Sequence, residues 1–229
     1  MRVLRGRAAD IDEDRAVTDH MVADAAETGR PAVRVWTPHR QVAFGRRDAR
    51  EPGYDTAREA ARDRGYSPYE RRTGGRAVAY TGHTVAFCRA EPVRELRTGI
   101  TERYEEAVET VGAALADCGV DAEQGEPDRS FCPGTHSLSA DGKLVGIAQR
   151  VTQGVARLGG IVVVRDHEAI ATVLDPIYDA LGVPFDPATV GSVARARGVE
   201  PPAVDPDAVA RALERRLVGD ATPTVEQVA

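Results

Sequence analysis

Cys132 and Lys143 are the two residues of this sequence whose types and settings point most directly to chemistry. Cys132 stands in the segment Phe-Cys-Pro-Gly-Thr-His at 131–136, and we expect a loop rich in proline and glycine to leave it accessible. A cysteine becomes a nucleophile where a nearby cation stabilises its thiolate. Lys143 is the only lysine, since the other 29 of the 30 basic residues are arginines. Because an ammonium group can titrate and fits where a guanidinium cannot, we predict a function for this lone lysine.

Both residues also have plainer interpretations. Free cysteine is among the most buried residue types, and this explains Cys118 on an apolar helix face and Cys88 at the end of an apolar strand. It fits Cys132 less well. Lys143 directly follows an Asp-Gly turn, so a solvated turn lysine is the alternative to a functional one. His136 is a candidate neighbour of Cys132, although a spacing of four residues in a loop does not ensure contact.

A second group of interest is Arg-Arg-Thr-Gly-Gly-Arg at 71–76, between two predicted strands. Adjacent glycines let backbone N–H groups approach a ligand, and flanking arginines can bind a carboxylate or phosphate. A simple tight turn is the alternative. The segment matches neither a Walker loop nor a GxGxxG pattern, so nucleotide binding of those kinds is not indicated. Gly146 lies within a predicted strand, which often marks a close approach by a ligand or another backbone.

Composition excludes several classes of protein. The net charge of −6 argues against nucleic acid as a bulk partner. No run of 18 apolar residues is present, so we expect no membrane-spanning segment. The first 16 residues lack the apolar stretch of a signal peptide, which predicts a cytoplasmic location. The three cysteines have no CxxC spacing and the five histidines form no ligand repeat, so we expect neither a disulfide framework nor a metal site.

The elements that must position these residues alternate between helical and extended patterns. Apolar residues at helical spacing predict helices at 10–28, 56–64, 100–118 and 167–181, followed by two helical segments that open with Asp-Pro at 186–187 and 205–206. Strands are predicted at 31–36, 41–44, on both sides of the double glycine, at 83–88, and at 155–164. Asp141-Gly142 is a favoured hairpin turn within 137–149. We expect the tail after Gly219 to be frayed.

This order predicts an α/β (α+β) fold with a mixed, largely antiparallel sheet flanked by helices. Three segments in succession, at 71–78, 131–143 and 143–150, resemble the signature of the biotin/lipoate protein ligase superfamily, which includes the lipoate–protein ligases A and octanoyltransferases. The resemblance runs from about residue 10 to residue 185, and the fold it implies agrees with the predicted elements. We therefore divide the chain into a lipoate/octanoate attachment catalytic domain at 1–185 and a C-terminal helical extension at 186–229.

Within the superfamily, Phe-Cys-Pro-Gly ahead of the lysine hairpin most resembles the cysteine-dependent octanoyl transferases and amidotransferases. The resemblance implies that Cys132 carries the acyl group as a thioester and that Lys143 orients or polarises the acyl carbonyl. It also implies a substrate-binding set that lines the acyl site: Arg72, Thr73, Gly74, Gly75, Arg76 and Gly146.

The implied activity is transfer of an octanoyl or lipoyl group to a lysine of a lipoyl domain or a glycine cleavage H-type carrier protein, with acyl-carrier protein as a further candidate partner. It needs no metal, no ATP and no tightly bound cofactor. One alternative is an ATP-dependent lipoate–protein ligase, in which Lys143 meets an acyl-adenylate and ATP and Mg²⁺ take part. The other is a non-catalytic subunit that binds lipoyl domains.

The sequence departs from the superfamily pattern at three places. A His-Asp pair often follows the double glycine, and here it is Tyr80-Thr81. An Asn-Asp or Tyr-Asp pair often precedes the lysine hairpin, and here it is His136-Ser137. The Gly-Arg-x-Gln motif appears as Gly-Arg-Arg-Asp at 45–48. These departures leave the substrate open.

Overall fold

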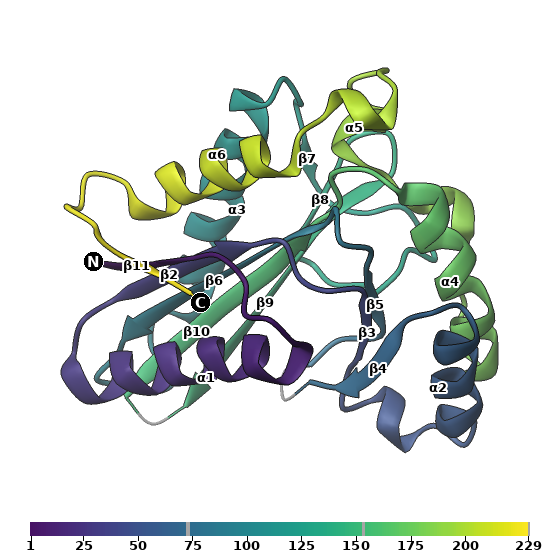
Figure 1. The fold of residues 1–229 in the computed structure, drawn as a ribbon, viewed down its shortest axis with the longest axis horizontal. Helices are drawn as coiled ribbons and strands as arrows, with labels where there is room; N and C mark the ends of the chain where they lie inside the picture. The colour runs from purple at the N-terminus through teal and green to yellow at the C-terminus, as the bar shows by residue number, and fades with distance from the viewer. Residues whose placement is uncertain (72–73, 153, 229) are drawn as a thin grey trace.

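The computed structural model describes residues 1–71, 74–152 and 154–228, and these build two sheets with helices packed on them (Figure 1). The larger sheet has the strand order β11-β1-β2-β6-β10-β9-β8-β7. Its strands are β1 (Arg2–Arg5), β2 (Ala32–Trp36), β6 (Val85–Pro92), β7 (Glu123–Gln124), β8 (Ser137–Ser139), β9 (Lys143–Thr152), β10 (Val155–Val162) and β11 (Thr224–Gln227). The β11–β1 and β1–β2 pairs are parallel and the other neighbouring pairs are antiparallel, which confirms the predicted mixed, largely antiparallel sheet.

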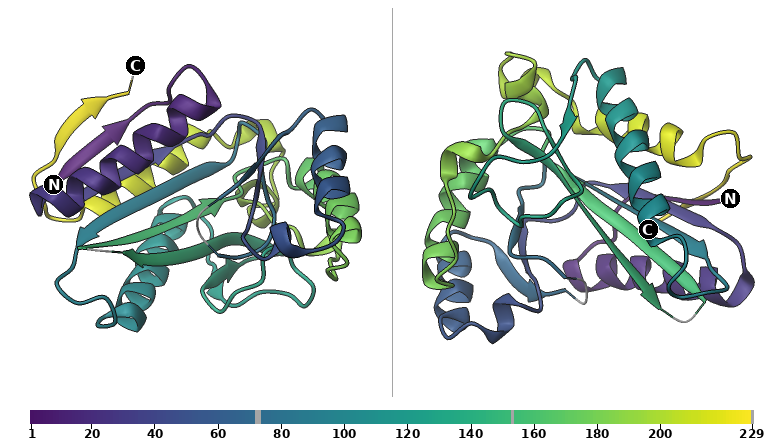
Figure 2. Two further views of the ribbon diagram at one scale, coloured as in Figure 1. Left: turned by 90° about the horizontal axis from the view of Figure 1, so that it is seen from below. Right: turned by 180° about the vertical axis from the view of Figure 1, so that it is seen from behind.

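Helices cover both faces of this sheet (Figure 2). Helix α1 (Ile11–Thr28) lies on one face, and α3 (Ile100–Asp117) and α6 (Pro206–Val218) lie together on the other. Successive side chains of a strand point to opposite faces, and β6 shows the consequence. Phe87 belongs to the core beneath α3 and α6, whereas Cys88 belongs to the core beneath α1.

The smaller sheet has the order β4-β3-β5, with β4 (Ser67–Glu70), β3 (Gln41–Phe44) and β5 (Val78–Tyr80). Helices α2 (Tyr54–Asp63) and α4 (His167–Ala180) pack beside it and against each other, and their shared core includes Phe44 and Tyr178. The double-glycine segment connects β4 to β5. The loop with Cys132 leads into β8, so residues from both sheets meet where these loops meet.

Four short elements complete the described chain: η1 (Asp48–Arg50), η2 (Pro187–Thr189), α5 (Val193–Ala196) and η3 (Pro201–Ala203). The first predicted Asp-Pro helix is therefore wrong, because Asp186 caps only the 3₁₀ turn η2. The second is confirmed, since Asp205 caps α6 and Pro206 is its first residue. The same capping chemistry thus starts both segments, but only α6 has an apolar face that packs on α3 and β2 and stabilises a longer helix.

The ends of helix α1 are set by capping residues close to them in the sequence. The Asp10 carboxylate accepts hydrogen bonds from the N–H groups of Asp12 and Glu13 at the start of α1, and Gly29 ends the helix with a φ of 68°. Asp141 and Gly142 both have positive φ and lie between β8 and β9 as predicted. The turn is longer than the expected two residues, because Ser139 pairs with Lys143 and the register is irregular there. The expected fraying after Gly219 is wrong, because Thr224–Gln227 forms β11 beside β1.

The predicted division at residue 185 stays a prediction. The residues after it contribute α6 and β11 to the layers of the larger sheet.

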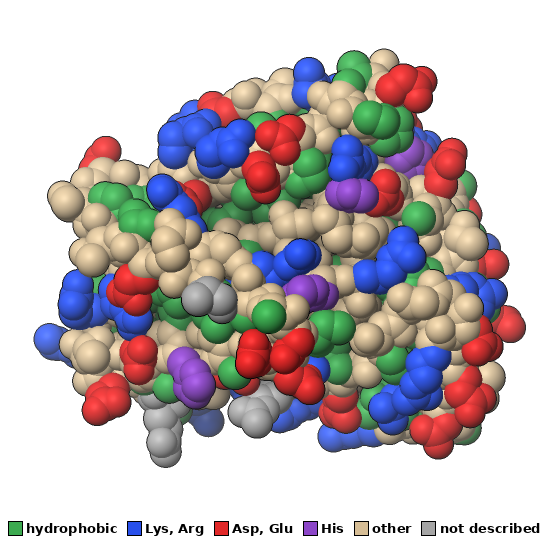
Figure 3. Space-filling view, viewed as in Figure 1, with side chains coloured by type: hydrophobic (Ala, Val, Ile, Leu, Met, Phe, Trp, Pro, Cys, Tyr) green, Lys and Arg blue, Asp and Glu red, His purple; other side chains and the backbone are tan. Residues whose placement is uncertain are grey.

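None of the helices in the described ranges has the length and apolar character needed to cross a bilayer. On the face shown in Figure 3, acidic and basic side chains are interspersed.

Candidate active site

The backbone at Cys132 is held in an unusual conformation. Its φ is 43°, in the left-handed region, which costs a residue with a β-carbon about 1–2 kcal/mol. Its N–H donates to the Tyr178 hydroxyl at 2.6 Å, and that hydroxyl donates to the carbonyl of Ala77 at 3.0 Å. Burial raises the pKa of Tyr178 well above its ordinary value, so the phenol stays protonated and can donate. The conformation of Cys132 is therefore imposed by its surroundings.

The sulfur of this half-buried cysteine lies against the double-glycine loop. Sγ accepts hydrogen bonds from the Arg76 N–H at 3.3 Å and from Arg71 Nη2 at 3.5 Å. Gly75 permits this approach, because a β-carbon there would lie 2.7 Å from the sulfur, and its φ of 93° also favours glycine. Two N–H donors, one of them cationic, are suitable partners for a negatively charged sulfur. The double glycine is therefore more than a tight turn.

Arg71 organises this loop, whereas the family resemblance implied a role for its neighbour Arg72. Its guanidinium donates to the carbonyls of Ala43, Gly74 and Arg76 at 2.8, 3.1 and 2.6 Å. Arg72 and Thr73 lie outside the described residues. No local signal in the sequence shows that the side chain of Arg71 turns back onto the loop.

The backbone N–H and the guanidinium of Arg76 have different partners. Its N–H faces the sulfur of Cys132, while its guanidinium donates to Glu51 at 2.8 Å and to Asp48 at 3.2 Å. Asp48 is buried and also accepts a hydrogen bond from the N–H of Gly45 at 2.8 Å, and burial raises the pKa of this carboxyl group. Asp48, the last residue of the Gly-Arg-Arg-Asp segment at 45–48, therefore stabilises the double-glycine loop through its contact with Arg76.

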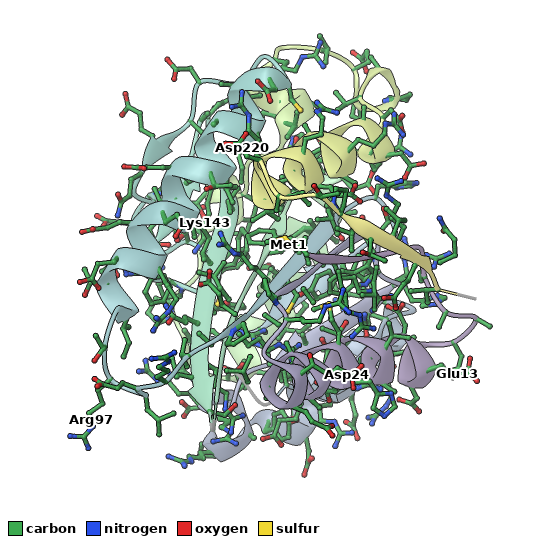
Figure 4. The ribbon with its side chains drawn as sticks, turned by 90° about the vertical axis from the view of Figure 1, so that its left-hand side faces the viewer. Met1, Glu13, Asp24, Arg97, Lys143 and Asp220 are labelled. Atoms are coloured by element: carbon green, nitrogen blue, oxygen red, sulfur yellow. The ribbon has the colours of Figure 1, made fainter. Side chains whose placement is uncertain are left out.

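Lys143 is completely buried at the start of β9 (Figure 4), which excludes the solvated turn lysine. Its ammonium donates to Glu126 Oε2 at 2.6 Å, to the Phe131 carbonyl at 2.8 Å and to the Cys132 carbonyl at 2.7 Å. All three N–H donors of the ammonium group are therefore occupied. An acyl carbonyl that receives a hydrogen bond from Lys143 must replace one of these acceptors.

Glu126 was not selected from the sequence. Besides Lys143, its carboxylate accepts hydrogen bonds from the Gly134 N–H and the Ser137 hydroxyl, both at 2.8 Å. Burial raises the pKa of Glu126, but the hydrogen bond and charge of Lys143, helped by Ser137 and Gly134, outweigh burial and hold it below its ordinary value. Glu126 lies in a loop with no recognisable motif, so only its contacts identify it.

Two further predicted residues have distinct settings. A β-carbon added at Gly146 would meet Lys143 Cε at 3.8 Å, an ordinary contact, so its role in admitting an acyl chain stays a prediction. His136 stacks on Tyr104 of α3, with ring centroids 3.8 Å apart and planes 8° apart. Within the described chain its Nδ1 is buried and makes no hydrogen bond.

The other two cysteines differ from Cys132 in environment, and all three are free thiols. Cys88 is buried, as predicted, and Cys118 is half-buried at the end of α3. Burial raises the pKa of both thiols, which disfavours their reactive thiolate form. Among the described residues, no group of three or more His, Cys, Asp or Glu side chains is arranged to hold a metal ion.

A cavity lies elsewhere on the molecule. It has a volume of about 450 Å³ and is lined by residues that include Trp36, His83 and Arg165. Within the described ranges its lining contains neither Cys132 nor Lys143. We assign the candidate site to the Cys132 loop, because hydrogen bonds from two N–H donors converge there on a cysteine sulfur, whereas the cavity lining in the described ranges includes no cysteine.

Residues 10–217 match the family described as lipoyl protein ligase A/B catalytic domain, and the chain belongs to this family. This confirms the superfamily resemblance. Among curated relatives, the chain is 31% identical over 151 residues to an octanoyl-[GcvH]:protein N-octanoyltransferase of Geobacillus kaustophilus, which covers 65% of this chain and 53% of that protein. It is 31% identical over 126 residues to a lipoyl-[GcvH]:protein N-lipoyltransferase of Listeria monocytogenes, which covers 54% of this chain and 45% of that protein. The chain spans about half the length of the curated relatives it matches.

Solved structures support the fold. A lipoate-protein ligase A crystallised with ATP superposes with a TM-score of 0.76 at 20% identity, covering 100% of this chain and 89% of that chain. A putative lipoate protein ligase of T. acidophilum gives a TM-score of 0.69 at 20% identity, covering 99% and 88%. At this level of identity the likeness concerns the fold alone.

Proposed function

We propose that this chain is an acyltransferase that moves an octanoyl or lipoyl group between carrier proteins through a thioester on Cys132. One observation carries the proposal: the Cys132 sulfur lies on the double-glycine loop between two N–H donors, while Lys143 binds the carbonyl of the same residue. A thiol held beside cationic and backbone donors is a suitable nucleophile for an acyl carbonyl.

The proposed transfer has two steps. In the first, the Cys132 thiolate attacks the acyl carbonyl of the donor, the bond from that carbonyl to the donor breaks, and the leaving group takes up a proton. In the second, the amine of the acceptor lysine attacks the thioester, loses a proton, and releases the thiolate of Cys132. Backbone N–H groups of the double-glycine loop would stabilise the oxyanion formed in each step. Lys143 would contribute by exchanging one of its three present acceptors for the oxyanion.

The names of the curated relatives suggest the substrates. Those proteins are named as transferases that take octanoyl or lipoyl groups from GcvH, so we propose a glycine cleavage H-type carrier as donor and a lipoyl-domain lysine as acceptor. Acyl-carrier protein is a further candidate donor. The reaction as proposed uses no ATP and no tightly bound cofactor, and we place it in the cytoplasm.

The test is intact-protein mass spectrometry of the purified chain after incubation with an octanoylated H-type carrier. We expect a gain in mass of one octanoyl group, lost in Cys132→Ala and retained in Cys118→Ala, since Cys118 is a half-buried thiol outside the site. An unchanged adduct in Cys132→Ala would show that Cys132 is not the nucleophile.

Two controls separate the alternatives. Modification of an acceptor domain by free octanoate or lipoate with ATP and Mg²⁺, independent of Cys132, would identify a ligase. Binding to a lipoyl domain without labelling by octanoylated H-type carrier, by octanoylated acyl-carrier protein or by octanoate with ATP would identify a non-catalytic subunit.

A further inference from the structure

The loop between β7 and β8 is held by hydrogen bonds to a single carboxylate, that of Glu126. Glu126 Oε1 accepts the N–H of Gly134, and Glu126 Oε2 accepts both the Ser137 hydroxyl and the Lys143 ammonium. These donors come from the middle of the loop, from β8 and from β9. Glu126 therefore ties the loop on either side of Cys132 to the edge of the larger sheet.

Lys143 extends this arrangement to the nucleophile. Its ammonium shares its remaining donors between the carbonyls of Phe131 and Cys132, the two peptide groups that bracket the positive φ of Cys132. Only one ammonium group separates the Glu126 carboxylate from the backbone of Cys132. The carboxylate thus fixes the position of the cation, and the cation fixes the peptide that aims the sulfur at Gly75.

We propose that Glu126 is a positioning residue for acyl transfer, which holds Lys143 and the Cys132 loop in the geometry that places the sulfur on the double-glycine loop. This inference deepens the proposed function, and its kinetic part rests on that function. Within the described residues, the hydrogen bonds of Glu126 reach Gly134, Ser137 and Lys143, while those of the sulfur come from Arg71 and Arg76. Glu126 acts through Lys143 on one side and through Gly134 and Ser137 on the other.

The arrangement requires a carboxylate. Donors arrive at both oxygens, with Gly134 on one and Lys143 and Ser137 on the other. A glutamine has the same shape but only one acceptor oxygen, so its amino group must face either the Gly134 N–H or the Lys143 ammonium. Glu126→Gln therefore opens one side of the loop with little change in volume, and is a sharper test than Glu126→Ala.

The first measurement does not depend on any substrate. Amide hydrogen exchange over 130–137 should be about tenfold faster in Glu126→Gln than in the unmodified chain, while exchange in β10 is unchanged. The matched control is Glu123→Gln, which removes an exposed carboxylate three residues earlier in β7. Equal protection of 130–137 in Glu126→Gln and the unmodified chain would overturn the proposed role of Glu126.

The second measurement is the single-turnover rate of acyl-enzyme formation from an octanoylated H-type carrier. Because misplacing a nucleophile by about 1 Å can cost about 100-fold, we expect a loss of that order in the maximal rate of Glu126→Gln. The donor concentration at half-maximal rate should stay within about threefold, since the role proposed for Glu126 is to position the nucleophile and not to bind the donor. An unchanged maximal rate would overturn the inference. If no acyl-enzyme forms in the unmodified chain, the proposed function fails, and the exchange result still decides whether Glu126 holds the loop.

Discussion

Lys143 Nζ lies 2.7 Å from the carbonyl oxygen of Cys132, so the only lysine of the chain holds the backbone of the candidate nucleophile. The family resemblance predicted that these two residues act on the same acyl group. In the structure they meet through the protein's own peptide group. Lys143 therefore stabilises the loop before any acyl group arrives. The residues that hold this loop together can each be tested by substitution.

Replacing Lys143 with methionine should lower the free energy of unfolding by about 3 kcal/mol, because it leaves the Glu126 carboxylate and two peptide carbonyls without their shared donor. Urea denaturation measures this loss. Arg97→Ala removes an exposed cation outside the site and should change the same free energy by less than about 0.5 kcal/mol. Equal stability of the two variants would contradict the role given to Lys143.

Alanine at Gly75 should impair the site more than alanine at Gly74. A β-carbon at Gly75 meets the Cys132 sulfur at 2.7 Å and Arg71 Nη2 at 2.6 Å, whereas one at Gly74 meets no atom within 4 Å among the described residues other than its chain neighbour. We expect Gly75→Ala to slow acyl-enzyme formation by about 100-fold or more. Mass spectrometry of the acyl adduct over time measures the rates. Similar rates in both variants would show that the sulfur does not need this approach.

Stability should depend on pH through Glu126. Its pKa is held below the ordinary value in the folded chain, mainly by Lys143 acting against burial. The ionised carboxylate therefore contributes stability above its unfolded pKa of about 4.3, and the contribution is lost as the pH falls through the lower folded value.

The measurement is urea denaturation of the unmodified chain and of Glu126→Gln. The difference in unfolding free energy should be largest near about pH 7 and shrink towards about pH 3, where the unmodified carboxyl group takes up its proton. A difference that stays constant over this range would exclude Glu126 as an ionised partner of Lys143.

Removing the Tyr178 hydroxyl should destabilise the Cys132 loop. Tyr178→Phe leaves the N–H of Cys132 and the carbonyl of Ala77 without this partner, at a cost of about 1–3 kcal/mol in unfolding free energy. Tyr66→Phe is the matched control, because Tyr66 is also buried but no hydrogen bond of its hydroxyl is found in the described chain. Thermal denaturation compares the two. A smaller loss in Tyr178→Phe than in Tyr66→Phe would contradict the assigned role.

The sequence by itself determined the features that depend on nearby residues. Helix α1 begins after Asp10 and ends at Gly29, because capping acts within one turn. Asp141-Gly142 forms its turn because both residues tolerate positive φ. The motifs also selected Cys132 and Lys143 as candidate site residues, since residue type and neighbours indicate chemistry without coordinates, and their catalytic roles stay predictions.

Only the tertiary structure decided which groups surround them. Three contacts join segments that the local pattern does not relate: Arg2 with Thr224, Arg71 with the Cys132 sulfur, and Glu126 with Lys143. Such contacts depend on burial and on hydrogen bonds that form only when distant strands and loops are brought together. No periodicity within a short segment records them, and this is why the supporting residues of the site were found from the fold.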